Sequence, residues 1–339
     1  MIRVGIVGYG YWGPNLVRNF SESPRFKVAS ISDLSSARRA AAEKQYPMAK
    51  VVADCKDVLA DPSVDAVAIS TPVSTHFEIA RAAIEAGKHV LLEKPMTREV
   101  GEAQRLVDLA AKHKTTLMVD HTFVYLGAVR KMKELADAGE LGELLYYDSV
   151  RINLGLFQHD VNVIWDLAPH DLSILDYLVA EKPVAVQATG TKHVAGRPES
   201  MAYVTLRYES SFLAHLHINW LAPVKIRQTL LGGTKKMIVY DDLAIAEKIK
   251  VYDRGVDVEP SPDVAYQLRV GYRSGDMWSP KIDQSEALKV EVAHFADCVE
   301  HGKTPVTDGE AGLRVVRVLA ATSKSISERG RVIRLGEDD

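Results

Sequence analysis

The sequence predicts an α/β protein with two domains, a doubly wound parallel sheet followed by an α+β domain with a large open, mostly antiparallel sheet. Three observations predict this fold class. A chain of 339 residues is long enough for about two domains of ordinary size. Its first half alternates short apolar runs with helical patterns. After about residue 142, strand-like segments follow one another directly.

Five runs in the first half are apolar on both faces, which is typical of strands buried in a parallel sheet. They cover residues 3–8, 27–33, 65–71, 89–95 and 116–121. Helical periodicity fills the segments between them. Strands that alternate with helices build a sheet that is covered by helices on both faces.

Seven closely spaced segments in the second half predict an antiparallel sheet. They cover residues 144–154, 183–193, 202–210, 212–220, 226–233, 235–242 and 248–253. In the fourth segment, period-two alternation places an apolar set on one face, namely Phe212, Ala214, Leu216, Ile218 and Trp220. The other face carries His215, His217 and Asn219. A His-x-His pair can bind a metal, but no carboxylate pattern accompanies this one, so a polar sheet face or a subunit interface is favoured.

Helical periodicity returns at Ser285, where an apolar stripe ends at Gly302. The stripe consists of Leu288, Val292, Phe295 and Val299. We expect this C-terminal helix to pack back between the two domains. The predicted division places the first domain at residues 1–121 and the second at residues 122–339.

The composition excludes several classes of protein. A net charge of −3 without long like-charge runs argues against binding to nucleic acid or to a membrane surface. The two cysteines, Cys55 and Cys298, are far apart and lack metal-ligand spacing, so we expect neither a disulfide framework nor a metal site. The N-terminus lacks the pattern of a secretory signal, and no apolar stretch is long enough to span a membrane. We therefore expect a cytoplasmic protein.

A glycine-rich loop directly follows the first predicted strand. In "GYGYWG" the glycines are Gly8, Gly10 and Gly13, with Tyr11 and Trp12 between them. This spacing between a strand and a helix, with an acid after the second strand, is the dinucleotide fingerprint of a Rossmann domain. The glycines allow a tight turn, close approach of the backbone to the pyrophosphate and close packing of the helix on the strand.

Asp33 supplies the acid of this fingerprint, twenty residues beyond Gly13. Its carboxylate can accept hydrogen bonds from the ribose hydroxyls and would repel a 2′-phosphate, so NAD is favoured over NADP. Arg38 and Arg39 follow in the next predicted helix, and an arginine there could still neutralise a 2′-phosphate. NADP therefore stays possible.

A second candidate site lies in "WDLAPHDLSILDYL", residues 165–178. Asp166 is a good N-cap residue, and Pro169 then falls in the first turn, where backbone N–H groups have no partner inside the helix. His170 would lie close to Asp166, beside the positive end of the helix dipole, which favours its neutral, base-competent form. These residues alone fit either a helix cap with an incidental histidine or an acid/base site.

The motif "GYGYWG", together with "STPVSTHFEIARAAIEAGKHVLLEKPMT" and "WDLAPHD", resembles the Gfo/Idh/MocA oxidoreductase family, named for glucose-fructose oxidoreductase and inositol dehydrogenase. The resemblance covers nearly the whole chain. It implies a Rossmann domain that binds NAD(P) and a second domain for substrate binding and oligomerisation. The implied activity is a dehydrogenase that transfers a hydride between nicotinamide and a secondary alcohol of a sugar or cyclitol.

The resemblance also implies roles for particular residues. Those implied to lie along the cofactor are Thr71, Pro72, His76, Glu93 and Lys94. Lys94 lies beside the reacting hydroxyl in the family, and a cis bond is implied before Pro95. Asp166 and His170 match the Asp-x-x-x-His pattern of the second domain, which favours chemistry over an incidental histidine. Many members have a glycine between the pair where this chain reads "LAP", so the aim of Asp166 is less certain.

The mechanism expected from these residues uses His170 as general base, Lys94 to stabilise negative charge on the alcohol oxygen, and Asp166 to orient His170 or bind an adjacent hydroxyl. Candidates for lining the substrate pocket are Tyr11, Trp12, His121, Tyr125, Asn153, Gln158, Asn162, Trp165 and Trp278. For each of these, packing in the core or at the rim is an equally open reading. The residues that we expect to bind the substrate are Lys94, His121, Tyr125, Asn153, Trp165, Asp166 and His170.

Within the family, the sequence looks most like the branch that acts on sugars or nucleotide sugars. The expected activity is that of a UDP-N-acetylhexosamine 3-dehydrogenase in polysaccharide biosynthesis, with an inositol or free-sugar dehydrogenase as the alternative. Two alternatives from other classes are a non-catalytic NAD(P)-binding regulator and an NAD-dependent glycosidase. The open second sheet also suggests a homodimer or homotetramer.

Overall fold

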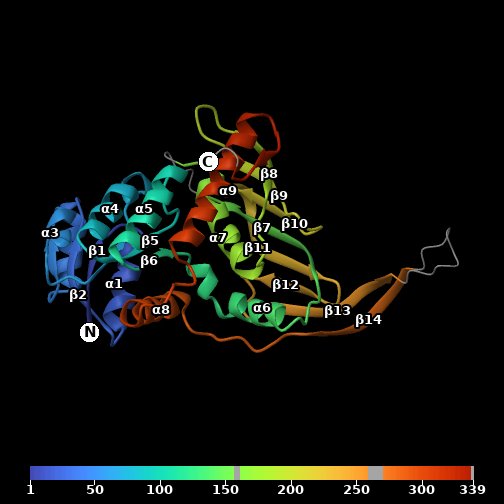
Figure 1. The fold of residues 1–339 in the computed structure, drawn as a ribbon, viewed down its shortest axis with the longest axis horizontal. Helices are drawn as coiled ribbons and strands as arrows, with labels where there is room; N and C mark the ends of the chain where they lie inside the picture. Colours follow the sequence, from blue (N-terminus) through green and yellow to red (C-terminus); the bar gives the residue numbers. More distant parts are fainter. Residues whose placement is uncertain (156–160, 259–269, 337–339) are drawn as a thin grey trace. The chain divides into compact units, whose positions relative to one another are not determined.

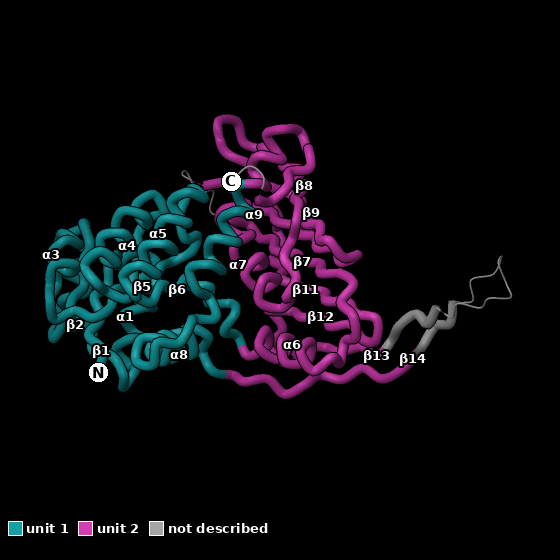
Figure 2. Tube along the Cα trace, viewed as in Figure 1, with its two compact units in different colours: residues 1–126, 285–320, 339 teal, residues 127–284, 321–338 magenta. Residues whose placement is uncertain are grey.

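In the computed structural model, the described residues are 1–155, 161–258 and 270–336. The chain forms two compact units, shown in different colours in Figure 2. Unit 1 contains Met1–Leu126 and Ser285–Ala320, and unit 2 contains Gly127–Gln284 and Ala321–Asp338. This division departs from the predicted boundary after residue 121, because a C-terminal segment returns to unit 1.

The sheet of unit 1 has six parallel strands in the order β3-β2-β1-β4-β5-β6. Their bounds are β1 Ile2–Val7, β2 Phe26–Ser32, β3 Lys50–Val52, β4 Ala66–Ile69, β5 His89–Glu93 and β6 Leu117–Asp120. Five of them confirm the predicted runs. Strand β3, an edge strand of three residues, was not predicted, because so short a segment has no measurable periodicity.

Helices cover both faces of this sheet (Figure 1). The elements are α1 Gly13–Glu22, α2 Ser36–Gln45, α3 Cys55–Leu59, α4 His76–Glu85, α5 Val100–His113 and the short 3₁₀ helices η1 Val73–Thr75 and η2 Thr122–Tyr125. Helix α4 packs against α3 and α5, whereas α1 packs against α8, Ala287–His301. The long helix α9, Gly309–Ser327, follows α8. A doubly wound parallel sheet is confirmed.

Helix α8 belongs to unit 1, and its predicted position between the domains stays a prediction. Its apolar stripe faces the aromatic core next to α1, where the Phe295 ring stacks on Phe26 at 6.1 Å and meets Phe20 edge-on at 6.5 Å. Gly302 ends the helix with a φ of +63°, as its position in the sequence predicts.

The sheet of unit 2 has nine strands in the order β14-β13-β12-β11-β7-β10-β9-β8-β15. Their bounds are β7 Leu144–Leu154, β8 Ala185–Thr191, β9 Met201–Arg207, β10 Leu213–Asn219, β11 Leu221–Gly233, β12 Met237–Asp241, β13 Ile249–Val258, β14 Val270–Trp278 and β15 Ile333–Arg334. Only the central β7–β10 pair is parallel, so the prediction of a mostly antiparallel sheet is confirmed. Strands β14 and β15 were not predicted.

Two helices, α6 Gly127–Asp137 and α7 Val163–Leu178, contact each other, and α7 packs on strands β7, β9 and β10. The predicted faces of residues 212–220 are confirmed, because the apolar set is buried. On the opposite face His217 stacks on Tyr203 with ring centroids 4.4 Å apart, and His215 lies 6.0 Å from the same ring.

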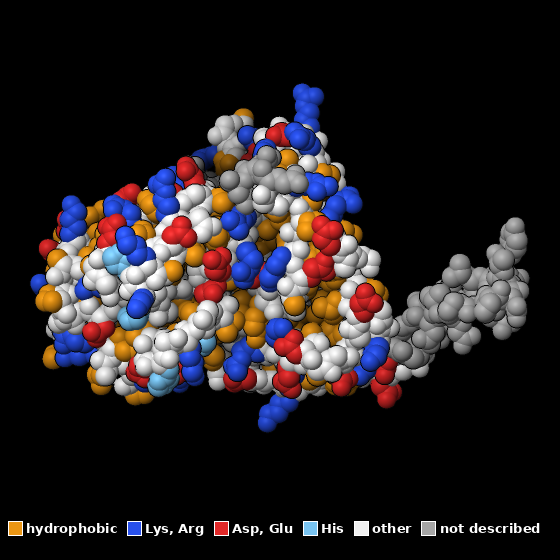
Figure 3. Space-filling model, viewed as in Figure 1, with side chains coloured by type: hydrophobic (Ala, Val, Ile, Leu, Met, Phe, Trp, Pro, Cys, Tyr) orange, Lys and Arg blue, Asp and Glu red, His pale blue; other side chains and the backbone are white. Residues whose placement is uncertain are grey.

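No helix within residues 1–155, 161–258 and 270–336 is both long and apolar enough to cross a membrane. The same residues contain no group of three or more His, Cys, Asp or Glu side chains that could hold a metal ion. On the face shown in Figure 3, basic and acidic side chains are interspersed rather than gathered in one patch.

Candidate functional site

The glycine-rich loop of unit 1 has the geometry that a bound pyrophosphate requires. Gly8 adopts a φ of +97°, a conformation that side chains disfavour, and a Cβ atom added there would lie 2.8 Å from the carbonyl oxygen of Ser70. At Gly13 an added Cβ would lie 2.3 Å from the carbonyl oxygen of Gly8. These contacts explain why the loop needs glycine at both positions.

Helix α1 starts at Gly13 without a capping side chain and without an acidic residue in its first turn. No capping side chain therefore accepts a hydrogen bond from the first backbone N–H groups of α1. These groups and the helix dipole favour an anion at this end. Loop and helix together fit the pyrophosphate of NAD(P).

Asp33 follows β2 and is held in place by the backbone. Its two carboxylate oxygens accept hydrogen bonds from the N–H of Tyr9 and the N–H of Ser35, each at 2.8 Å. An ionised carboxylate has about four acceptor positions, so two are left for ribose hydroxyls. The Arg38 guanidinium lies 3.6 Å from Asp33 and its side chain is 56% exposed, so it is free to turn towards solvent.

His76, at the start of α4, has a buried side chain. Its Nδ1 lies 2.9 Å from the carbonyl oxygen of Pro95 and its Nε2 lies 2.9 Å from that of Thr71. Both ring nitrogens therefore face protein atoms. The imidazole joins the loop after β4 to the loop after β5, and burial lowers its pKa. The Lys94–Pro95 peptide bond is cis, as predicted.

Three carboxyl groups gather at the carboxyl ends of β5 and β6. Glu93 and Asp120 are paired residues of the two strands. The indole N–H of Trp12, in the glycine-rich loop, donates to Asp120 Oδ2 at 2.7 Å, and the Thr122 hydroxyl donates to Oδ1. The third carboxyl belongs to Glu291 on α8, which is fully buried. Burial, and after it the Asp120 carboxylate, raises the pKa of Glu291 well above its ordinary value, which favours the protonated form of this side chain.

This buried acid predicts a decline of stability with rising pH. The folded protein binds the Glu291 proton more tightly than the unfolded chain does, so unfolding releases a proton once the pH exceeds the ordinary value of 4.5. The free energy of unfolding then falls with pH until the folded-state pKa is passed, by about 1.4 kcal/mol for each unit of pKa difference. Glu291→Gln removes this contribution, and urea unfolding from pH 5 to pH 9 measures it.

Glu286→Gln, at the start of the same helix, is a control of opposite sign. Hydrogen bonds from Arg18, at 2.6 and 3.0 Å, lower the pKa of Glu286. The ionised carboxylate stabilises the fold above its pKa in the unfolded chain, and this contribution is lost as the pH falls through its pKa in the folded protein. Glu286→Gln therefore lowers the free energy of unfolding at neutral pH. Parallel pH profiles for wild type and Glu291→Gln would contradict the buried-acid interpretation.

In unit 2, the start of α7 corrects the predicted cap. Asn162 is the N-cap residue, and its side-chain oxygen accepts hydrogen bonds from the N–H groups of Ile164 and Trp165, both at 3.1 Å. Asp166 lies in the first turn instead, and Pro169 lies inside the helix. The predicted start of the helix is four residues too late, because both asparagine and aspartate favour the N-cap. His170 is thus beyond the first turn, where the helix dipole has little effect.

Two aspartates of α7, Asp166 and Asp171, are each held by a buried contact with a residue from the sheet region of unit 2. The indole N–H of Trp220, a fully buried side chain, donates to Asp166 Oδ2 at 3.0 Å. Arg151 on β7 forms a buried bidentate ion pair with Asp171, with distances of 2.7 and 3.0 Å. The sequence analysis assigned Trp220 to the buried face of β10 but missed both contacts.

Other predicted residues lie in different surroundings. Tyr125 is buried in unit 1 with its hydroxyl 3.1 Å from the Thr307 hydroxyl, and its role in substrate binding stays a prediction. His121 is also buried, whereas Tyr11 is 95% exposed and Asn153 is half-buried on β7. Gln158 lies outside the described residues.

The remaining described candidates, Asn162, Trp165 and Trp278, contact other protein groups as well. Trp165 donates to the Ser323 hydroxyl at 3.0 Å, and Asn162 is occupied as the cap of α7. The Lys236 ammonium lies over the Trp278 ring, 4.9 Å from its centroid. These three side chains therefore have structural contacts of their own.

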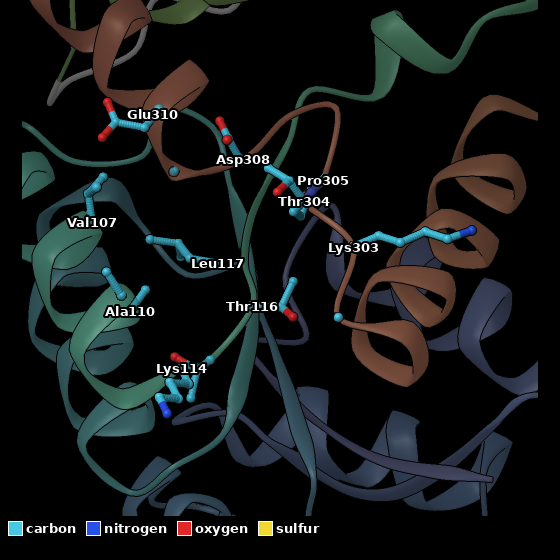
Figure 4. Close-up of a pocket in the computed structure, with 14 residues that line it drawn as sticks. Val107, Ala110, Lys114, Thr116, Leu117, Lys303, Thr304, Pro305, Asp308 and Glu310 are labelled. Atoms are coloured by element: carbon cyan, nitrogen blue, oxygen red, sulfur yellow. The ribbon is translucent and has the colours of Figure 1, made fainter.

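A cavity of about 350 Å³ in unit 1 lies near the amino end of strand β6, whereas a dinucleotide binds at the carboxyl ends of the strands (Figure 4). It is lined by Leu117 at the start of β6, by Val107 and Ala110 on α5 and by Asp308 and Glu310 near the start of α9. The Lys303 side chain extends away from Leu117 in this view. Ligands of doubly wound sheets bind at the carboxyl ends of the strands, so this cavity is separate from the candidate site.

Comparison with known proteins identifies the chain. A family described as "Oxidoreductase family, NAD-binding Rossmann fold" (GFO_IDH_MocA) matches residues 2–121, and the corresponding C-terminal domain (GFO_IDH_MocA_C3) matches residues 129–239. The chain belongs to this family. The oxidoreductase is an NAD(P)-dependent dehydrogenase acting on CH–OH groups.

Three relatives show the range of this oxidoreductase family. The scyllo-inositol 2-dehydrogenase (NAD(+)) of Bacillus subtilis is 26% identical, covering 95% of this chain and 93% of its own. The scyllo-inositol 2-dehydrogenase (NADP(+)) IolW of the same organism is 29% identical, covering 98% and 96%. The solved structure of UDP-N-acetylglucosamine 3-dehydrogenase GnnA from Acidithiobacillus ferrooxidans has a TM-score of 0.82 and 25% identity, covering 96% and 98%.

Proposed function

We propose that the oxidoreductase acts on a nucleotide sugar and transfers a hydride between the 3-position of a UDP-N-acetylhexosamine and the nicotinamide. The observation that carries this proposal is the likeness to UDP-N-acetylglucosamine 3-dehydrogenase along both chains. Such a reaction belongs to polysaccharide biosynthesis. An inositol dehydrogenase is the second candidate, because the scyllo-inositol enzymes are equally similar.

The proposed roles follow from what alcohol oxidation requires. The hydroxyl must lose its proton while the carbinol carbon loses a hydride, which bound NAD accepts. His170 takes the proton as general base, and the Lys94 ammonium donates a hydrogen bond to the same oxygen and stabilises its developing negative charge. Asp166 orients His170 or binds an adjacent hydroxyl.

Cofactor binding is proposed for the residues predicted from the sequence, with one change. The backbone at Gly8, Gly10 and Gly13 binds the pyrophosphate, with Tyr11 and Trp12 in the same loop, and Asp33 binds the ribose. Thr71, Pro72, Glu93 and Lys94 lie along the nicotinamide side. Because its nitrogens face Thr71 and Pro95, His76 positions these two loops rather than touching the cofactor.

Asp33→Ala is expected to weaken NAD binding more than NADP binding. The variant loses charge-assisted hydrogen bonds to the ribose, each worth about 1.5–3 kcal/mol, so the Kd for NAD rises about 10- to 100-fold. NADP gains in relative terms, because the repulsion of its 2′-phosphate is removed. Fluorescence titrations with NADH and NADPH measure the two Kd values for wild type and variant.

Asp54→Ala is the matched control for that change. Asp54 also follows a strand of unit 1 and accepts a backbone hydrogen bond, from the N–H of Lys56 at 2.9 Å. Its removal should leave both Kd values within about twofold of wild type, as expected for a surface substitution. Equal losses of NAD and NADP affinity in Asp33→Ala would contradict the ribose assignment.

We also propose self-association through the exposed face of the unit 2 sheet, as a homodimer or homotetramer. This face carries Tyr203, Leu213 and Ile226, which are 39%, 44% and 36% exposed. Exposed apolar side chains on one face of a sheet are typical of an interaction surface. Sedimentation at micromolar concentration tests the proposal, and a monomer would contradict it.

The substrate is tested with a panel of UDP-N-acetylglucosamine, UDP-N-acetylgalactosamine, free sugars and inositols, each with NAD and NADP. The proposal expects the highest kcat/KM with a UDP-N-acetylhexosamine, seen as accumulation of reduced cofactor. Preference for an inositol would support the second candidate. Hydrolysis of a glycoside without accumulation of reduced cofactor would indicate a glycosidase, and neither reaction would indicate a regulator.

A further inference from the structure

Burial and backbone hydrogen bonds hold the Trp220 side chain in place. It connects β10 to β11 and is among the largest fully buried side chains of the protein. Its backbone N–H donates to the carbonyl oxygen of Ser200, and its own carbonyl oxygen accepts from the N–H of Gly155, both at 2.9 Å. A Cβ atom added to Gly155 would lie 2.5 Å from Cδ1 of the indole, so glycine is needed for this packing.

The one polar atom of this side chain is used on Asp166. The indole N–H donates to Oδ2 at 3.0 Å, across 54 positions of the sequence. Without such a contact, the carboxylate of an aspartate can rotate about χ2, because the preferred range of this torsion is broad. The hydrogen bond from a fixed indole removes that freedom and directs the other oxygen of Asp166.

We infer that Trp220 is a positioning residue for the reaction, which sets the orientation of the Asp166 carboxylate in unit 2. The inference rests on the proposed function, in which Asp166 orients His170 or binds a substrate hydroxyl. Helix α7 itself is held by the Arg151–Asp171 ion pair, so Trp220 adds the orientation of one side chain to a backbone that is already fixed. Trp220 does not touch the reacting atoms.

The test compares Trp220→Phe with wild type on the alcohol that has the highest kcat/KM in the substrate panel. A hydrogen bond to a charged group is lost, so kcat/KM falls about 10- to 100-fold while the Kd for NADH stays within about twofold. Because phenylalanine leaves a cavity in a buried site, a second variant carries β-(3-benzothienyl)alanine at position 220. This residue keeps the bicyclic shape and replaces the N–H by sulfur, and it should lose activity to the same extent.

Tyr240→Phe is the matched control. Tyr240 is also buried in unit 2, and its hydroxyl donates to the Asp242 carboxylate at 2.9 Å. The variant loses a buried hydrogen bond to a carboxylate, as Trp220→Phe does, but this bond does not involve Asp166. We therefore expect kcat/KM to stay within about threefold of wild type. A loss as large as that of Trp220→Phe would show that any lost buried hydrogen bond in this unit lowers activity, which would overturn the inference.

A double-mutant cycle separates positioning from general destabilisation. If Trp220 acts through Asp166, Trp220→Phe should have almost no further effect on kcat/KM in an Asp166→Asn background. Equal losses in both backgrounds, or full activity of both Trp220 variants, would overturn the inference. A panel without any active alcohol, or full activity of Asp166→Asn and His170→Ala, would instead overturn the proposed function on which the inference rests.

Discussion

Replacing His170 by alanine lowers turnover by about 10²- to 10⁴-fold, the usual contribution of a general base. The variant has no group to accept the hydroxyl proton as the hydride leaves, so the loss appears in kcat. NAD binds to groups of unit 1, so the Kd for NADH stays near that of wild type. Steady-state kinetics across pH 6 to 10, together with cofactor titration, measure both effects.

His193→Ala serves as the control for this substitution. His193 is an exposed histidine of unit 2, with its Nδ1 2.9 Å from the Ser200 hydroxyl, and it lies on no element of the proposed site. Its removal should leave kcat within about twofold. Full turnover of His170→Ala at every pH would refute its assignment as the base.

Breaking the Arg151–Asp171 ion pair destabilises the protein by about 3–5 kcal/mol, the cost of leaving one buried charge without its partner. Both side chains are almost fully buried, with exposures of 4% and 3%. Asp171→Ala and Arg151→Met should each show this loss in urea unfolding. The double variant Arg151→Met/Asp171→Leu removes both charges and fills the space, so it should recover most of the stability.

The surface pair of Arg331 and Glu328 is the comparison for this ion pair. Its nitrogen and oxygen are 2.9 Å apart, but the Arg331 side chain is 70% exposed. Arg331→Ala should cost at most about 1 kcal/mol, because solvent screens the charges. A similarly small cost for Asp171→Ala would mean that the buried pair does not hold α7 against the sheet.

Most of the sheet of unit 1 and the glycine-rich loop could be predicted from the sequence, because their signals are local. Apolar runs mark the strands, and the spacing of Gly8, Gly10 and Gly13 constrains a single turn. Strand β3 was missed because three residues carry no periodicity. The start of α7 was misplaced because two good capping residues, Asn162 and Asp166, lie four positions apart.

The contacts that orient the site could not be predicted in the same way, because they join distant segments. Trp220, between β10 and β11, donates to Asp166 on α7, and Arg151 on β7 donates to Asp171 on α7. One signal was nevertheless present. Glu291 occurs within the apolar stripe of its helix, three positions after Leu288 and four before Phe295, and an ionisable residue on a buried face indicates unusual surroundings for that group.

The position of α8 shows a further limit of sequence patterns. Its stripe correctly predicted a helix with one buried face, but a stripe does not say which surface will cover it. The rings of Phe20 and Phe26 supply that surface in unit 1. The expectation of a helix between domains therefore had no support in the pattern itself.

The central claim is that Lys94 and His170 act on one alcohol oxygen. A crystal structure of the protein with NADH and its alcohol substrate tests it most directly. The account predicts the Lys94 Nζ and one ring nitrogen of His170 within about 3.2 Å of the same substrate oxygen, at hydrogen-bonding distance. A substrate oxygen bound by other groups, with either side chain turned away from it, would contradict the account.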